Sequence, residues 1–283
     1  MGDHRLDYLV NCSMLFTEWP LLERPAAARA AGFDAIEFWW PWPEQPAPAD
    51  ADLDAFVRAI RDAGVRLIGL NFFAGDLAGP DAGVLSIPDR SEQFRDNLDV
   101  AVGIGEQLDV AAFNALYGNR IDGVASEQQD ELARENLGRA ADAAARIGAT
   151  VLVEPVSGPK PYPLRTADDA VAVVAAVRAA GHENVGFLCD LFHLANNGDD
   201  VDAAIARHAD VTRHVQIADH PGRGEPGSGE LDLDRHLRDL ADRGYVGWVG
   251  LEYKPTTDTE TSLQWLPMER RAAHGLTRER GRA

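Results

Sequence analysis

Short apolar runs recur along the chain, and longer amphipathic segments separate them. The runs have the length and near-continuous hydrophobicity of strands that are buried on both faces of a parallel sheet. We predict eight such strands, at residues 6–13, 35–38, 65–71, 110–116, 150–155, 185–190, 212–219 and 247–253.

The segments between the strands have the spacing of helices with one apolar face. Several end in a glycine shortly before the next strand, as expected for a left-handed helix cap. The connection at 191–211 leaves room for only a short helix, within "NNGDDVDAAIARHAD". The other predicted helices cover 20–31, 53–63, 91–108, 127–147, 166–180 and 232–243.

Eight alternating strands and helices over 283 residues favour an α/β fold of the single (β/α)8 TIM-barrel type. A doubly wound sheet is the alternative, but no Gly-x-Gly-x-x-Gly motif follows the first strand. No change in composition marks a linker, so residues 1–283 are predicted to form one domain. From about residue 259 we expect a closing helix and then a basic tail.

The net charge of −19 is unfavourable for binding nucleic acid or an anionic membrane surface. The chain also lacks an uncharged apolar run long enough to span a bilayer, and its first residues do not resemble a signal peptide. Its two cysteines, Cys12 and Cys189, do not suggest a disulfide framework. We therefore expect a cytoplasmic protein with a small-molecule partner and with neither nucleic acid nor membrane as a partner.

Four oxygen-bearing side chains stand at the ends of the last four predicted strands: Glu154, Asp190, Gln216 and Glu252. In a parallel barrel these ends share one rim, where active sites lie. Three buried carboxylates repel one another unless a cation compensates their charge. All-oxygen ligands suit Mg²⁺ or Mn²⁺ better than zinc. A single acid at a strand end can also be a helix cap, but four in succession favour a metal site.

Two histidines lie near these residues in sequence. His193 follows Asp190 by three positions and is either a structural histidine or a donor to a substrate oxygen. His214 shares a strand face with Gln216, where it would donate to a carboxylate beside the metal or contact the substrate.

Several stretches resemble the hydroxypyruvate isomerase family of xylose-isomerase-like TIM barrels. They are "LVEPVS" (152–157), "CDLFH" (189–193), "HVQIADHPGRGEPGSGE" (214–230) and "GYVGWVGLEYKP" (244–255), and the similarity extends over about residues 6–256. The resemblance implies a divalent metal held by Glu154, Asp190, Gln216 and Glu252, with Glu154 and Glu252 as the acid/base pair. It also implies interconversion of hydroxypyruvate and tartronate semialdehyde through an enediolate, with no organic cofactor.

The segment "SGPKPYPL" (157–164) departs from the family pattern, which leaves related activities open. These are an oxo-tetronate isomerase, a ketose 3-epimerase and a sugar or inosose dehydratase. A metal-dependent nuclease or a catalytically silent binding protein fits the charge and the retained glutamates less well.

A carboxylate substrate needs a cationic partner. Arg223 is the first candidate, because a guanidinium binds a carboxylate at two points, and Lys160 is the second. The tryptophan-rich stretch 37–45 is expected to wall the pocket or to form a contact in a homo-oligomer. The long segment 72–90 has the character of a loop that folds over an active site.

Overall fold

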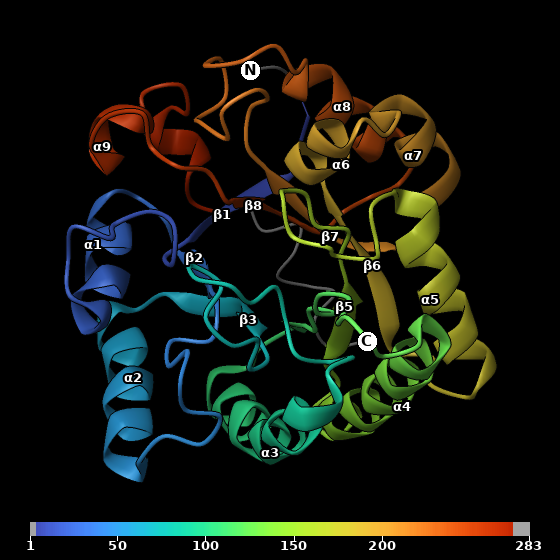
Figure 1. Ribbon diagram of the computed structural model, residues 1–283. Helices are drawn as coiled ribbons and strands as arrows, with labels where there is room; N and C mark the ends of the chain where they lie inside the picture. The colour runs from blue at the N-terminus through green and yellow to red at the C-terminus, as the bar shows by residue number, and fades with distance from the viewer. Residues whose placement is uncertain (1–3, 274–283) are drawn as a thin grey trace.

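A closed barrel of eight parallel strands forms the centre of the computed structural model, which describes residues 4–273. The strands follow one another around the barrel in chain order, and helices surround it (Figure 1). This confirms the predicted (β/α)8 fold. The strands are β1 (Asp7–Asn11), β2 (Ala35–Phe38), β3 (Arg66–Asn71), β4 (Ala112–Asn114), β5 (Thr150–Val153), β6 (Val185–Asp190), β7 (Thr212–Ile217) and β8 (Trp248–Leu251).

The helices lie close to their predicted positions, and α3 agrees with its prediction at both ends. Thr166 caps α5 through a reciprocal pair of hydrogen bonds with Asp169, which fixes that boundary. At the end of α2, Gly64 has a positive φ of 66°, the conformation that glycine adopts most readily. The main helices are α1 (Arg24–Ala30), α2 (Asp50–Ala63), α3 (Ser91–Leu108), α4 (Ser126–Ala145), α5 (Ala167–Ala179) and α8 (Leu233–Asp242), and the 3₁₀ turn η1 (Leu21–Glu23) precedes α1.

Two parts of the chain differ from the prediction. The sixth connection holds two helices, α6 (Leu191–Asn197) and α7 (Val201–His208), because Asp190 and Asp200 each cap a helix. Up to residue 273 the predicted closing helix does not form, and one turn, α9 (Thr259–Ser262), and a 3₁₀ turn, η3 (Met268–Arg270), are found instead. Pro267 directly before η3 is incompatible with an uninterrupted helix. The predicted basic tail lies largely outside the described residues.

Apolar side chains fill the lower part of the barrel interior. One buried layer comprises Leu9, Ala35, Ile68 and Trp248, and a second comprises Ala112, Leu152 and Leu188. A larger apolar core lies between the strands and the surrounding helices. The upper part of the interior, at the carboxyl ends of the strands, is left to polar side chains. None of the helices described between residues 4 and 273 combines the length and apolarity needed to cross a bilayer.

Candidate active site

A ring of buried polar side chains occupies the carboxyl end of the barrel. Every strand supplies one, from its last residues or from the residue just beyond it. All eight are at most 7% exposed: Asn11, Glu37, Asn71, Asn114, Glu154, Asp190, Gln216 and Glu252, in the order β1 to β8. The structure thus brings together the four oxygen-bearing residues predicted from the sequence, and it adds four that the sequence analysis missed.

Three carboxylates of this ring form a tight cluster with His193. Glu154, Asp190, Glu252 and His193 each offer a ligand atom, and these atoms lie within 4.8 Å of one another. Burial and the charge of Glu252 raise the pKa of Asp190 to about 7. Burial and the charges of Glu252 and Asp190 raise the pKa of Glu154 well above its ordinary value. Ionising all three carboxylates together is therefore unfavourable without a cation.

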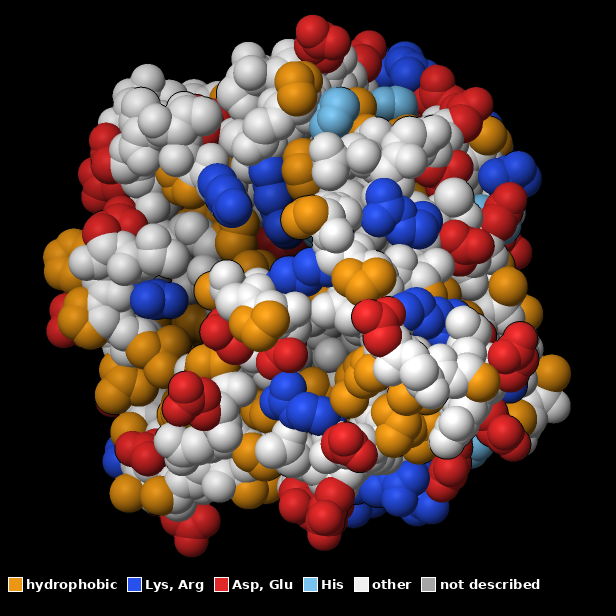
Figure 2. Space-filling view, in the orientation of Figure 1, with side chains coloured by type: hydrophobic (Ala, Val, Ile, Leu, Met, Phe, Trp, Pro, Cys, Tyr) orange, Lys and Arg blue, Asp and Glu red, His pale blue; other side chains and the backbone are white. Residues whose placement is uncertain are grey.

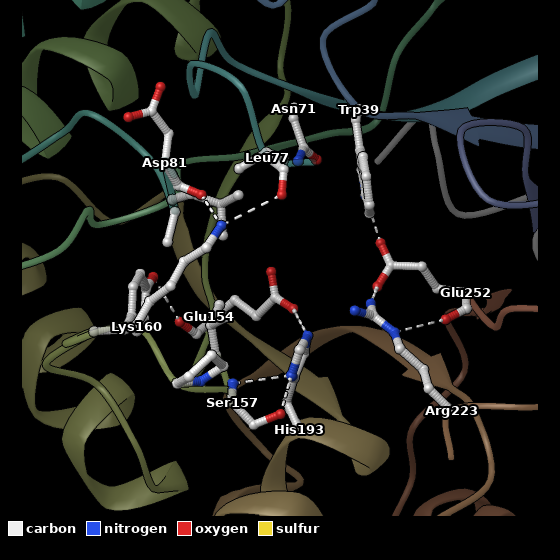
Figure 3. A pocket seen from close by; sticks show the side chains of 15 residues that line it. Trp39, Asn71, Leu77, Asp81, Glu154, Ser157, Lys160, His193, Arg223 and Glu252 are labelled. Atoms are coloured by element: carbon white, nitrogen blue, oxygen red, sulfur yellow. Dashed lines mark hydrogen bonds and ion pairs between the residues drawn. The ribbon is translucent and has the colours of Figure 1, made fainter. Parts of the chain in front are cut away.

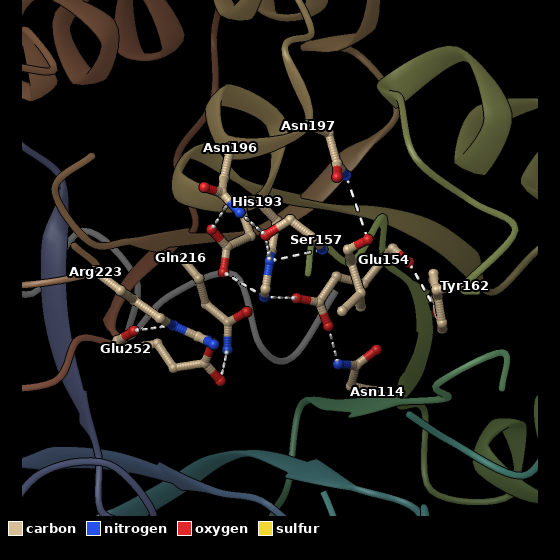
Figure 4. Close-up of polar contacts among 12 residues, drawn as sticks. Asn114, Glu154, Ser157, Tyr162, His193, Asn196, Asn197, Gln216, Arg223 and Glu252 are labelled. Carbon is tan, nitrogen blue, oxygen red and sulfur yellow. Dashed lines mark hydrogen bonds and ion pairs between the residues drawn. The ribbon is translucent and has the colours of Figure 1, made fainter. Parts of the chain in front are cut away.

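Gln216 faces the same cluster with its amide oxygen. Its Nε2 donates to Glu37 Oε1 at 2.8 Å. It also donates to Glu252 Oε1 at 3.2 Å (Figure 4). Its Oε1 is buried and accepts no hydrogen bond from any residue between 4 and 273. A buried carbonyl oxygen without a donor is costly, and a cation would satisfy it. The residues therefore fit a divalent metal, and the cluster could hold one.

Glu252 is held by donors on both carboxylate oxygens. Asn11 Nδ2 and Trp39 Nε1 donate to Oε1 at 3.1 and 2.7 Å, and Arg223 Nη2 donates to Oε2 at 2.5 Å. Burial nevertheless raises the pKa of Glu252, although Arg223 opposes the shift. Of the three tryptophans in the stretch 37–45, Trp39 lines the pocket as expected, whereas Trp42 packs on Trp40 and Phe56.

The loop after β7 places Arg223 over the site. Arg223 has a φ of 62°, and the buried Asp219 carboxylate accepts hydrogen bonds from the backbone of His220, Gly227 and Leu231. These bonds tie the two arms of the loop together. The guanidinium stacks over Phe192 at 5.3 Å from the ring centre. Arg223 is thus fixed at the mouth, where a substrate carboxylate could reach it.

His193 stands at the start of α6, directly beneath the cavity. Its Nδ1 accepts a hydrogen bond from the Ser157 backbone N–H at 2.9 Å. Burial lowers the pKa of His193 well below its ordinary value, so the ring is neutral. Because Nδ1 is an acceptor, the proton sits on Nε2, which lies 3.8 Å from both Glu154 Oε1 and Asp190 Oδ2. This tautomer suits a hydrogen-bond donor better than a metal ligand.

Lys160 lines the cavity, but its ammonium points to another loop. It donates to the backbone carbonyls of Asp81 at 2.5 Å and Leu77 at 3.4 Å (Figure 3). Its ammonium thus bridges to the segment 72–90, and its contact with a substrate carboxylate stays a prediction. That segment does fold over the site, as the sequence suggested.

His214 also has a partner other than substrate. Its Nε2 lies 2.7 Å from Glu37 Oε2, and both side chains are buried. The interactions with His214, Gln216 and Asn11 outweigh burial, so they lower the pKa of Glu37. Of the two predicted roles of His214, donation to a carboxylate agrees with this geometry. A contact with substrate does not.

The cavity enclosed by these residues has a volume of about 150 Å³. Glu154 and His193 line one side, Glu252 with Arg223 and Trp39 a second, and Lys160 with Leu77 and Asp81 a third (Figure 3). Figure 2 shows a hollow at this end of the barrel with Lys and Arg side chains near its rim. A space this small suits a compact polar substrate, since pockets for drug-sized ligands are several times larger.

Comparison with known proteins agrees with the fold. Residues 25–268 match the family model of the xylose isomerase-like TIM barrel. The hydroxypyruvate isomerase of Escherichia coli is 32% identical over 263 residues, which cover 92% of this chain and 98% of that protein. The chain belongs to the hydroxypyruvate isomerase family. It is accordingly an isomerase.

Two further relatives of the chain carry different names. A Streptomyces coelicolor protein provisionally named as a hydroxypyruvate isomerase is 56% identical and covers 96% of this chain and 100% of that protein. The 2-oxo-tetronate isomerase of Cupriavidus necator is 34% identical and covers 92% of this chain and 96% of that protein.

Some residues of the site were not predicted from the sequence, and they differ in how clearly the sequence marks them. Glu37 is a charge inside the apolar run "AIEF", which is unusual for a buried strand. Asn11 and Asn114 lie within runs of small or apolar residues and carry no charge. Only closure of the barrel shows that their amides point at Glu252 and Glu154, to which they donate at 3.1 and 2.7 Å.

Proposed function

We propose that the protein interconverts hydroxypyruvate and tartronate semialdehyde by moving a proton between neighbouring carbons. The observation that carries the proposal is the pair of buried glutamates, Glu154 and Glu252, which face one small cavity beside Arg223. The hydroxypyruvate isomerase names of the relatives support the choice of substrate.

Arg223 would bind the substrate carboxylate through its guanidinium, which fixes the reacting carbons between the glutamates. His193 Nε2–H would donate to a substrate oxygen, since its proton is held on that nitrogen by the Ser157 N–H. Trp39, Leu77 and Leu116 line the cavity and would limit the access of water.

Glu252 would act as the base, because three side chains donate to Oε1 and Arg223 donates to Oε2, and these donors favour its ionised form. It would remove a proton from C3, and the electron pair would form the C2–C3 double bond of an enediolate. Glu154 accepts from Asn114 Nδ2 at 2.7 Å and has fewer donors than Glu252, so it would be the partner that delivers a proton. Delivery of that proton to C2, with transfer of the C3 hydroxyl proton to the C2 oxygen, would complete the isomerisation. Glu252 would then return its proton to Glu154 by exchange with solvent.

Glu154, Asp190, Gln216 and Glu252 would hold the metal, with Mg²⁺ or Mn²⁺ favoured by the oxygen donors. When bound, a divalent ion would stabilise negative charge on the substrate oxygens. The unpartnered Gln216 Oε1 and the raised pKa of Asp190 support this ligand set.

A substrate panel tests the proposed function. Purified protein with Mn²⁺ is incubated separately with hydroxypyruvate, a four-carbon 2-oxo-tetronate and a ketohexose, and the products are followed by NMR. We expect the highest kcat/KM with hydroxypyruvate. Preference for the ketohexose, or formation of an unsaturated product, would show that the reaction assignment is wrong.

A 2-oxo-tetronate isomerase is the second candidate, because a relative of that name is 34% identical. The substrate carries one more carbon and hydroxyl group. The cavity of about 150 Å³ can admit either acid, so its volume does not choose between them. The panel separates the two candidates by their relative kcat/KM.

A further inference from the structure

Glu37 has no place in the proposed proton transfers, yet it lies at the centre of the buried network beneath the site. It projects from β2 into the barrel and is 4% exposed. Its Oε1 accepts from Asn11 Nδ2 at 3.1 Å and Gln216 Nε2 at 2.8 Å, and its Oε2 lies 2.7 Å from His214 Nε2. The carboxylate is therefore fixed at both oxygens.

Two glycines make room for this carboxylate, because they have no side chain. A Cβ on Gly250 of β8 would lie 2.7 Å from Glu37 Oε1, and a Cβ on Gly69 of β3 would lie 3.2 Å from Glu37 Oε2. Neither Gly69 nor Gly250 has a positive φ, so the backbone conformation does not explain why glycine stands at these two positions. The close approach of the Glu37 side chain does.

Glu37 determines which way the Gln216 amide points. The amide group can turn over, exchanging its nitrogen and oxygen at little cost in shape. Here its nitrogen lies against Glu37 and Glu252, which accept hydrogen bonds when ionised. The opposite orientation would place an amide oxygen against carboxylate oxygens, so Oε1 is directed away from Glu37.

We propose that Glu37 is a positioning residue that presents the Gln216 oxygen to the metal. This inference rests on the proposed function, in which Gln216 is a metal ligand. A glutamine ligand needs such a partner, because only one of its two terminal atoms can bind a cation. A carboxylate at this position would need no such partner, since both of its oxygens can bind a cation.

A double-mutant cycle read by Mn²⁺ binding isolates this role. Isothermal titration calorimetry is performed on the wild type, Glu37→Gln, Gln216→Glu and the double variant, and thermal unfolding checks that each is folded. Glu37→Gln keeps the size of the side chain but can donate to Gln216 Oε1 and turn the amide. We expect a 10- to 100-fold loss of Mn²⁺ affinity, as for other residues that orient metal ligands.

In the Gln216→Glu background, Glu37→Gln should lower Mn²⁺ affinity by less than about threefold, because either oxygen of a carboxylate can bind the metal. Equal losses in both backgrounds would show a general effect of charge or packing and overturn the inference. So would unchanged affinity in Glu37→Gln alone. If Glu37→Gln does not fold, Gly69→Ala takes its place in the cycle, because a Cβ at Gly69 would meet Glu37 Cβ and Oε2, each at 3.2 Å, and would not press on Gln216.

Gln216→Ala separates this inference from the proposed function. If Gln216→Ala weakens Mn²⁺ binding and Glu37→Gln does not, Gln216 remains a ligand and only the positioning role is overturned. If Gln216→Ala leaves Mn²⁺ affinity unchanged, or the wild type does not bind Mn²⁺, both are overturned. Glu225→Gln is the matched control, since Glu225 lies on the rim and bonds to Thr256.

Discussion

Buried glutamates of this protein differ in pKa because their neighbours differ. Glu37 and Glu154 are both buried, yet hydrogen bonds from His214, Gln216 and Asn11 lower the pKa of Glu37. Burial beside Glu252 and Asp190 raises the pKa of Glu154. Glu37 is therefore suited to act as a fixed, ionised acceptor, whereas Glu154 in the metal-free site more readily holds a proton.

At the residue scale, Glu252→Gln tests the acid/base assignment. The amide keeps the size of the side chain but cannot accept the C3 proton, so kcat should fall by about 10²–10⁴-fold. Steady-state kinetics with hydroxypyruvate measures the loss, and thermal unfolding confirms that the variant is folded. Turnover within a few fold of the wild type would exclude Glu252 as the base.

The pKa of Asp190, raised to about 7, gives a second residue-scale prediction. Below that pH the metal-free carboxyl holds a proton, which a metal must displace. Mn²⁺ affinity should therefore decrease as the pH falls from 8 to 6, with proton release on binding. Calorimetry in two buffers of different ionisation enthalpy measures both quantities. An affinity that is constant over this range would contradict the assignment of Asp190 as a ligand.

At the scale of elements, the loops after β3, β5 and β7 complete the site that the strands begin. The hydrophobic pattern predicted the strands and most helices because burial on both faces leaves a clear apolar run, as in "VGFLCD" of β6. It did not predict the bridge from Lys160 to Leu77 and Asp81, since the acceptors are backbone carbonyls that any sequence provides. It also extended a helix through Pro267, where the chain forms only short turns.

Lys160→Met tests the bridge between the two loops. Methionine keeps much of the side-chain length but loses the hydrogen bonds to both carbonyls. We expect faster hydrogen exchange of backbone amides at 76–83 and a KM for hydroxypyruvate raised several fold, with little change in Tm. Lys254→Met, at an exposed lysine after β8, is the control. Unchanged exchange and KM would show that the bridge does not shape the site.

At the scale of the whole molecule, the closed barrel converts eight separate strand ends into one polar ring. The members at the last four strands could be predicted, because three of them are acids, which are conspicuous at strand ends in a sequence. Asn11 and Asn114 could not, since a neutral amide at the end of a strand has many uses. Their role depends on register across the barrel, as where Asn11 pairs with Glu37 between β1 and β2.

Metal binding should also stabilise the whole fold, because it offsets repulsion among three buried carboxylates. At a Mn²⁺ concentration 100 times its Kd, binding adds about 2.7 kcal/mol to the free energy of unfolding. We expect Tm to rise by a few degrees with Mn²⁺ and to return to its starting value with a chelator. Calorimetric melting curves measure the shift, and Asp190→Asn should reduce it. A Tm that does not respond to Mn²⁺ would show that the cluster does not bind this metal.

Proton NMR of the reaction in D₂O tests the central claim most directly. Hydroxypyruvate is incubated with the Mn²⁺-loaded protein, and a parallel sample contains excess chelator. We predict tartronate semialdehyde labelled with deuterium at C2, because Glu154 would exchange its proton with solvent before delivering it, and no product in the chelated sample. Absence of tartronate semialdehyde, or equal formation with and without chelator, would contradict a metal-assisted isomerisation by Glu154 and Glu252.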